Sequence, residues 1–267
     1  MPEHPHVQDA YAPREIALKV EQLGVAKAQA GSLSLLVLAV LGGAFIALGA
    51  LFYLVLSTGS TLGFGPTRAL GGLGFSLGLI LVVVAGAELF TGNNLLAMAW
   101  ASRRVSTPLL LRHWLLAYAG NVLGAAGCAL LAWLAGLDAL AQGQLGETAL
   151  RIAQAKAALS PTEALARGVL CNALVCLAVW LALAGRSVAD KVLAIVFPVT
   201  AFVAIGAEHC IANWFFLPYA WALDGQGTLA LPALAANLAW VTVGNLLGGT
   251  LLVAGVYWLA YLRQPAA

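Results

Sequence analysis

The stretch Gly86-Ala87-Glu88-Leu89-Phe90-Thr91-Gly92-Asn93-Asn94 closes one apolar run, and Gly206-Ala207-Glu208-His209-Cys210-Ile211-Ala212-Asn213 repeats its Gly-Ala-Glu-x-x-x-x-Asn pattern inside another. In both stretches an acidic residue, with glycine or asparagine nearby, interrupts a row of apolar side chains. Such residues favour turns over a continuous helix. The sequence therefore predicts two broken helices at related positions.

The composition of the chain around these stretches excludes a water-soluble protein. Hydrophobic residues make up 62% of the 267 residues, and only 13 basic and 11 acidic side chains are present. So few charges cannot cover the surface of a soluble fold of this size. The net charge of +2, without a basic block, also gives no footprint for nucleic acid. We expect an all-α integral membrane protein.

A membrane-spanning helix needs about 20 mostly apolar residues. Six stretches meet this requirement, the second and fifth being the interrupted ones: 32–56, 69–87, 114–137, 168–185, 192–221 and 231–262. The predicted domains are a cytoplasmic segment, residues 1–31, a six-helix membrane domain, residues 32–262, and a cytoplasmic tail, residues 263–267. Within the first segment, Ile16, Val20 and Leu23 recur at helical spacing among charges, which predicts an amphipathic helix on the membrane surface.

The basic residues orient these spans. Nine lie in the N-terminal segment, the tail and the gaps after spans two and four, whereas four lie on the opposite side: Arg68, Arg151, Lys156 and Arg167. The positive-inside rule then places both termini in the cytoplasm.

A second pair of motifs supports an internal duplication. Gly120-Asn121-x-x-Gly124 recurs as Gly244-Asn245-x-x-Gly248, in the third span of each half. Two consecutive units of three spans lie in opposite orientations, which is the inverted-repeat architecture of many transporters. Broken helices at matching positions of such repeats indicate a permeation site near the midplane, and their N-terminal ends attract anions.

Several of these residues resemble signatures of the formate/nitrite transporter family. The stretches 83–92 and 168–178 are similar to its two signatures, 206–213 resembles its histidine motif, and 244–249 resembles its last span. The similarity runs from about residue 15 to residue 262, with Ala173 as one departure. The resemblance implies an aquaporin-like protomer with its own pore, a homopentamer, no cofactor, and residence in the inner membrane of a bacterium.

His209 is the sharpest candidate site residue because it is the one histidine placed within a predicted span. An ionisable side chain at membrane depth is a functional candidate by default, although a neutral histidine bonded within the bundle is the plainer interpretation. Moving a bare carboxylate-sized ion into a low dielectric costs on the order of 20 kcal/mol. The hypothesis is that His209 stabilises the anion and donates a proton, so that a weak acid crosses in neutral form.

Three further polar residues are predicted to line the pore by resemblance to the family. Thr91 offers a hydroxyl to the anion or to His209, with helix capping as the alternative. Asn172 offers an amide, with helix packing as the alternative. Lys156, otherwise a solvated surface charge, is expected to concentrate anions in the external vestibule and to assist protonation of the histidine.

Other candidates have structural or gating roles. Glu88 and Glu208 are expected to accept bonds from the interrupted backbone, because a carboxylate in an anion pore would repel the substrate; Asn213 belongs with them. The resemblance assigns apolar constrictions, for which plain packing is the alternative, to Phe75, Leu79, Leu89, Phe90 and Phe202.

The predicted function is a channel for small monovalent anions, formate first, with protons as possible co-substrates. Nitrite, hydrosulfide and short carboxylates remain alternatives, since one methyl group changes pocket discrimination by only about 1–3 kcal/mol. A neutral-solute pore also suits the repeat, but His209 and Lys156 favour anions. The spans hold no cluster with metal-ligand spacing, which argues against a metal site and an enzyme, and a membrane scaffold would not need paired breaks.

Overall fold

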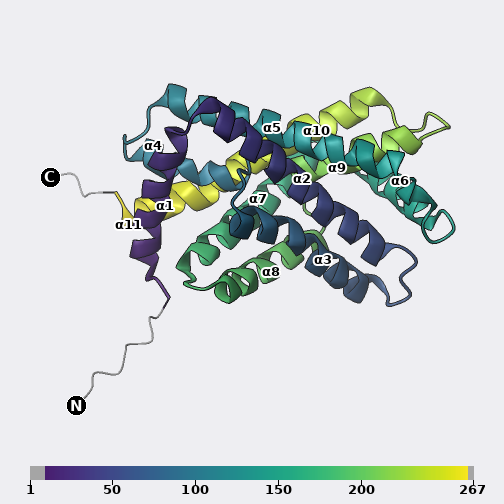
Figure 1. The fold of residues 1–267 in the computed structure, drawn as a ribbon, viewed down its shortest axis with the longest axis horizontal. Helices are drawn as coiled ribbons and strands as arrows, with labels where there is room; N and C mark the ends of the chain where they lie inside the picture. The colour runs from purple at the N-terminus through teal and green to yellow at the C-terminus, as the bar shows by residue number, and fades with distance from the viewer. Residues whose placement is uncertain (1–9, 264–267) are drawn as a thin grey trace, which may run out of the picture.

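The computed structural model describes residues 10–263, which are all helical apart from turns and connections. Residues 1–9 and 264–267, parts of the two predicted cytoplasmic segments, lie outside the described residues. The elements follow in chain order (Figure 1): α1 Pro13–Ala28, α2 Ser32–Ser57, α3 Phe64–Ala85, the 3₁₀ helix η1 Gly92–Leu96, α4 Ala97–Ala101, α5 Thr107–Leu134, η2 Leu137–Ala139, α6 Gln144–Ala157, α7 Pro161–Ala184, α8 Val188–Ala204, α9 Cys210–Leu223, α10 Leu231–Leu247, the π-helical η3 Gly248–Gly255 and α11 Val256–Tyr261.

Within the described chain, five helices are long and apolar enough to cross a membrane: α2, α3, α5, α7 and the continuous run from α10 to α11. This confirms the prediction of an all-α, multi-pass membrane protein. The predicted fifth span corresponds to α8 and α9, which have 17 and 14 residues and are separated by residues 205–209.

Both Gly-Ala-Glu stretches begin where a helix ends. Gly86 follows α3 with φ +86°, and Gly206 follows α8 with φ +75°. In each case the next residue donates its N–H back across the final turn, Ala87 to the Val82 carbonyl (2.9 Å) and Ala207 to the Phe202 carbonyl (3.0 Å). Glycine adopts this left-handed conformation without steric cost, so it terminates both helices at the same point of the motif.

Other glycines bring the helices into close contact. A Cβ at Gly124 of α5 would collide with the Val40 carbonyl of α2, and one at Gly248 would collide with the Val169 carbonyl of α7. Small residues allow such approach of membrane helices, whose association depends on packing because lipid supplies no hydrophobic driving force. The repeated Gly-Asn-x-x-Gly motif therefore fixes one helix crossing in each half.

The predicted N-terminal helix is present as α1. Ile16 and Val20 are buried in a cluster with Met98 and Trp180, whereas Leu23 is exposed. The protein itself therefore covers part of the apolar face of α1, and its placement on the membrane surface stays a prediction. In Figure 1, α1 and α11 lie at one end of the molecule and α6 at the other.

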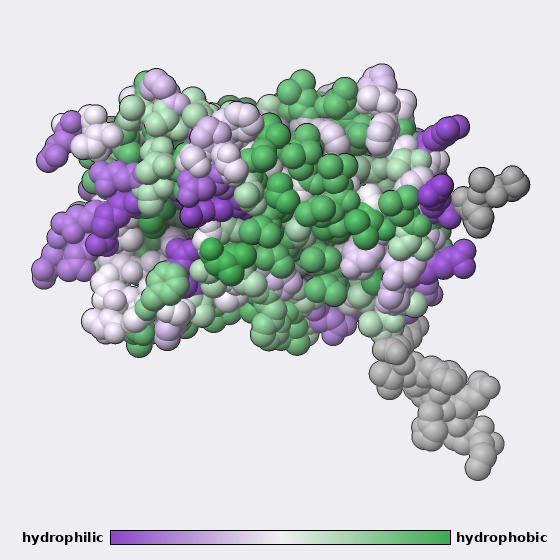
Figure 2. Space-filling view, turned by 180° about the vertical axis from the view of Figure 1, so that it is seen from behind, coloured by the Kyte–Doolittle hydropathy of each residue, from purple (hydrophilic) through white to green (hydrophobic). Residues whose placement is uncertain are grey.

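The surface is banded along the long axis of the molecule. Figure 2 shows hydrophobic side chains over the middle of the visible face and hydrophilic side chains concentrated toward both ends. Many large apolar side chains are exposed on the long helices, among them Leu48, Leu115 and Leu252. Lipid or neighbouring subunits are the environments that suit such a belt.

Candidate pore and its two vestibules

A buried ion pair holds the second break. Glu208 accepts from Lys156 Nζ at 2.9 Å on both carboxylate oxygens and from Asn213 Nδ2 at 2.7 Å. Asn237 of α10 joins this group: its oxygen accepts from Asn213 (2.8 Å), and its nitrogen donates to the Lys156 carbonyl (2.9 Å). These four side chains form the external network, which is named for the predicted side of Lys156.

A corresponding group holds the first break. Glu88 accepts from Lys27 Nζ at 2.8 Å and from Asn93 Nδ2 at 2.7 Å. His113 of α5 takes the place of Asn237: its Nε2 lies 2.9 Å from Asn93 Nδ2, and its Nδ1 lies 3.2 Å from the Lys27 carbonyl. Lys27, Glu88, Asn93 and His113 form the internal network.

The two repeated asparagines of the third spans clamp the interrupted backbone. Asn121 Nδ2 donates to the carbonyls of Glu88 (2.8 Å) and Ala39 (2.6 Å), and its oxygen accepts from the Phe90 N–H (2.8 Å). Asn245 makes the same set of bonds in the second half (2.8 Å each), with the carbonyls of Glu208 and Gly168 and with the Cys210 N–H. These amides satisfy backbone groups that lipid could not.

The expectation that Glu88 and Glu208 accept bonds from the interrupted backbone is therefore corrected. Their carboxylates bind lysine and asparagine side chains, and the broken backbone is bonded by Asn121 and Asn245 instead. A carboxylate needs a cationic partner when buried, whereas a neutral amide can supply both a donor and an acceptor to a peptide group.

Thr91 and His209 meet between the two breaks. Thr91 Oγ1 lies 3.1 Å from His209 Nε2, and both side chains are buried. His209 also caps α9, since its Nδ1 accepts from the Ala212 N–H at 3.2 Å. In the neutral imidazole this assigns the ring proton to Nε2, which donates to Thr91 and leaves the Thr91 hydroxyl proton available for another acceptor.

The side chain of Asn172 lies next to the backbone of Thr91. Its Nδ2 donates to Asn94 Oδ1 (2.7 Å) and to the Asn245 carbonyl (2.7 Å), and lies 3.3 Å from the Thr91 carbonyl. Within the described residues its amide nitrogen is thus occupied by protein acceptors. This geometry fits the packing alternative, in which Asn172 positions the backbone of Thr91.

Two cavities open next to the breaks. The external cavity, about 170 Å³, has Phe75, Phe202 and His209 in its lining, and the internal cavity, about 300 Å³, has Leu79 and Leu89. The Phe75 and Phe202 rings pack edge to face at 5.6 Å, and both lie within 6.4 Å of the His209 ring, between centroids. Phe90 lines neither of these cavities and packs on Tyr118 at 5.0 Å.

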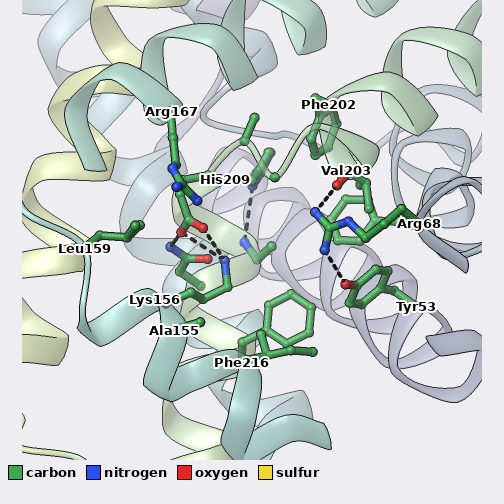
Figure 3. A pocket seen from close by; sticks show the side chains of 17 residues that line it. Tyr53, Arg68, Ala155, Lys156, Leu159, Arg167, Phe202, Val203, His209 and Phe216 are labelled. Carbon is green, nitrogen blue, oxygen red and sulfur yellow. Dashed lines mark hydrogen bonds and ion pairs between the residues drawn. The ribbon is translucent and has the colours of Figure 1, made fainter. Parts of the chain in front are cut away.

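Lys156 lines the external cavity, where Figure 3 shows it below His209. Its charge is paired with Glu208 at 2.9 Å, and the predicted concentration of anions by Lys156 in the vestibule stays a prediction. The expectation that it assists protonation of His209 is wrong, because an ammonium group repels a second positive charge.

Six residues of the site were not predicted from the sequence: the network members Lys27, Asn93, His113 and Asn237, and the cavity-lining arginines Arg68 and Arg167. A signal for the networks was present: Asn121 and Asn245 lie eight residues after His113 and Asn237, respectively. Pairing the halves residue by residue aligns Asn93 with Asn213 and His113 with Asn237, but it does not align Lys27 with Lys156, which lie 61 and 52 residues before their glutamates. Within residues 10–263 no group of three or more His, Cys, Asp or Glu residues could hold a metal ion.

Comparison with known proteins gives one consistent result. The family model described as formate/nitrite transporter matches residues 14–259. The formate channel FocA of Escherichia coli K12 is 40% identical over 274 residues, covering 96% of each chain. A solved pentameric formate channel with formate bound shares 39% identity and a TM-score of 0.80, covering 87% of this chain and 98% of that one. An FNT family ion channel shares 29% identity and a TM-score of 0.85, covering 94% and 99%.

These relatives are channels and transporters, which confirms both the resemblance seen in the sequence and the prediction that the chain is not an enzyme. The fold, the length of the match and the identity agree over nearly the whole chain. The protein belongs to the formate/nitrite transporter family and is an anion channel of that family.

Proposed function

We propose that the protein conducts formate across the inner membrane through a pore in each protomer, with Thr91 and His209 at its centre. The observation that carries the proposal is the buried Thr91–His209 hydrogen bond, 3.1 Å long, where two interrupted helices meet. It lies between an external and an internal cavity. The formate channels among the relatives support formate as the first substrate.

The proposed path has apolar walls on both sides of its centre. Phe75 and Phe202 would form the external constriction, and Leu79 and Leu89 the internal one; Phe90 would support Leu89 from behind. Phe75 and Leu79 lie one turn apart on α3, so the two constrictions would be about 6 Å apart along that helix. An anion crossing this distance loses most of its water and requires a donor in between.

Thr91 is the proposed donor. With the imidazole proton on Nε2, His209 donates to Thr91, and the threonine hydroxyl donates to the anion. Protonation of the anion, which would let formic acid cross in neutral form, requires a proton delivered through this pair or from the water of a vestibule. His209 would then stabilise the anion through Thr91.

The matched networks support the finer architecture. We propose six spans in two inverted repeats of three, with α3 and α8 as the first parts of the broken second and fifth spans. Lys27, Glu88 and Asn121 correspond in their bonds to Lys156, Glu208 and Asn245. Residues 32–262 then form one membrane domain, and both termini lie in the cytoplasm at the end where α1 meets α11.

The proposed assembly is a homopentamer. The solved relative with formate bound is pentameric, and this chain covers 98% of it. Large exposed apolar side chains along α2, α5 and the last helices offer surface for subunits and lipid alike. In this assembly each protomer would keep its own pore, because Thr91 and His209 meet inside the helices of one protomer.

The test is solute flux into proteoliposomes that contain the purified protein. Formate, nitrite, hydrosulfide, chloride and glycerol are compared between external pH 5 and 8. Fast formate flux that depends on pH is the expected result, and a faster nitrite flux would move the substrate assignment to the alternative. Glycerol flux without anion flux would overturn the proposal.

A matched pair of variants tests the centre itself. T91V removes the hydroxyl and should reduce formate flux at least tenfold, since no other donor replaces it, whereas T91S keeps the hydroxyl and should retain most of the flux. Equal flux in both variants would assign Thr91 to helix packing.

A further inference from the structure

The external cavity carries more positive charge than the internal one. Its lining includes the cations Arg68, Lys156 and Arg167 and a single carboxylate, Glu208. Lys156 and Glu208 neutralise each other at 2.9 Å, so the excess charge belongs to the two arginines. The internal cavity is lined by one cation and one carboxylate, which are paired in the internal network.

The two guanidinium groups face the same small space. A Cβ built at Gly206 would lie 3.4 Å from Arg68 Nη2 and 3.8 Å from Arg167 Nη1, with no other group within 4 Å. The two nitrogens are therefore separated by at most the sum of these distances, 7.2 Å. Charge-assisted hydrogen bonds of about 2.8 Å from each side would bring both nitrogens onto one small oxyanion.

Arg68 is held rigidly in this position. Its Nε donates to the Ala204 carbonyl (3.2 Å), Nη1 to the Tyr53 hydroxyl (3.0 Å) and Nη2 to the Val203 carbonyl. Each terminal nitrogen keeps one further N–H. Because the end of α8 fixes this guanidinium, a ligand would not have to order it on binding.

Arg167 comes from α7 on the other side of the cavity (Figure 3). Its side chain donates no hydrogen bond within the part of the chain that the structure describes. The acid that lies nearest along its own helix, Glu163, accepts from Ser160 (2.7 and 2.9 Å). Glu163 feels the charge of Arg167 but forms no ion pair with it within 4.0 Å, so an exposed arginine at the cavity rim keeps N–H groups that are suited to bind an anion from solution.

The equivalent position of the first half carries no charge. The Arg167 carbonyl accepts from the Glu208 N–H, as the Leu38 carbonyl accepts from the Glu88 N–H. The duplicated scaffold therefore does not require an arginine here. The side chain at residue 167 adds a feature to one vestibule only.

We propose that Arg68 and Arg167 form an entry subsite, which holds a small oxyanion between two guanidinium groups before it reaches Phe75 and Phe202. The inference rests on the proposed function, since the ligand is the anion that is conducted. Guanidinium groups bind two-oxygen anions such as formate in a planar, forked arrangement, which an ammonium cannot provide. The subsite lowers the external formate concentration at which flux saturates.

The experiment measures formate flux against formate concentration in proteoliposomes with uniform orientation and the external face outward. R167Q should raise the half-saturating concentration roughly threefold to tenfold, with the maximal flux unchanged. R167K keeps the charge but lacks the forked guanidinium, so its half-saturating concentration should be closer to that of R167Q than to that of the unsubstituted protein. R151Q removes the same charge from α6, outside both cavities, and should leave the concentration unchanged.

The outcomes separate the subsite from the channel. Equal shifts of the half-saturating concentration in R167Q and R151Q would show that the effect comes from the overall field of the vestibule. An R167K curve equal to that of the unsubstituted protein would show that a point charge is sufficient. Either result overturns the proposal. Saturating formate flux with an unchanged R167Q curve also rejects the subsite while leaving the channel intact. Absence of anion flux in the unsubstituted protein rejects the proposed function itself.

Discussion

The internal and external networks are built on the same plan but differ in side chains and in burial. Each joins a lysine, a glutamate and an asparagine, yet the fourth member is His113 in one and Asn237 in the other. The residue after the glutamate is Leu89 in the first half and His209 in the second. The comparison separates the side chains that hold a broken helix, which both halves keep, from His209, the proposed proton-handling group, which only the second half has.

The two ion pairs also differ in burial, and the external pair is the more buried. The side chains of Lys156 and Glu208 are 13% and 6% exposed, whereas those of Lys27 and Glu88 are 32% and 13% exposed. A more buried ion pair suffers more from loss of one partner, because the remaining charge has less access to water. The external pair is therefore the more vulnerable of the two.

The largest effect is expected from breaking the two ion pairs in parallel. K156M should lower the free energy of unfolding by about 3–5 kcal/mol, because Glu208 is left as an unpaired buried charge. K27M should cost about half as much, since the Glu88 side chain is more exposed and its charge keeps more access to water. Denaturant unfolding in detergent measures both, and an equal loss would contradict the role assigned to burial.

Giving position 209 the side chain of its counterpart in the first half tests the proposed role of His209. H209L gives position 209 the side chain of Leu89, so the centre loses its ring and Thr91 loses its partner. Formate flux should fall about 100-fold or more, the range typical of losing a positioned proton-handling group. Flux and pH dependence within twofold of the unsubstituted protein would remove His209 from the mechanism. Circular dichroism checks that the variant is folded.

The clamping asparagines should behave alike. N121A and N245A each remove three hydrogen bonds to the backbone near a break, and at about 0.6 kcal/mol per bond in a membrane protein each should cost about 2 kcal/mol. Thermal unfolding of the two variants side by side provides the measurement. A difference of more than about 1 kcal/mol would show that the two breaks are not equivalent in structure.

The smallest effect is expected from making the networks more alike. H113N gives the internal network the fourth side chain of the external one and leaves a small gap, because asparagine is shorter than the fully buried histidine. The unfolding free energy should fall by about 1 kcal/mol, with formate flux unchanged. A large loss of flux would assign His113 a role in conduction that the comparison denies it.

The sequence predicted much of the fold because its signals are local. Gly86 and Gly206 terminate their helices at the expected points, and five of the six predicted runs form helices long enough to cross a membrane. Helix α1 is a case in which the local signal is insufficient. Ile16 and Val20 have helical spacing, but only their contact with Met98 and Trp180 shows that protein covers them. Periodicity describes an apolar face, and packing decides what lies against it.

The candidate site was predictable in part for the same reason. His209, Thr91 and Lys156 come from motifs, and the structure brings the first two into contact. Asn172 donates to Asn94 and to the Asn245 carbonyl, and Phe90 packs on Tyr118; both facts depend on the direction in which each side chain points in the fold. The position of a residue in a motif does not show in which direction its side chain points.

The sequence by itself determined the membrane environment and the family, because composition and signature residues are written along the chain, and its repeated motifs predict an internal duplication. Only the tertiary structure decided the partners of the buried charges: that Lys27, 61 residues before Glu88, neutralises it, and that Lys156 does the same for Glu208. Likewise, only the tertiary structure brings Arg68 and Arg167, which come from different helices, close to Gly206. Electrostatic pairing depends on distance in space, and the fold alone sets that distance.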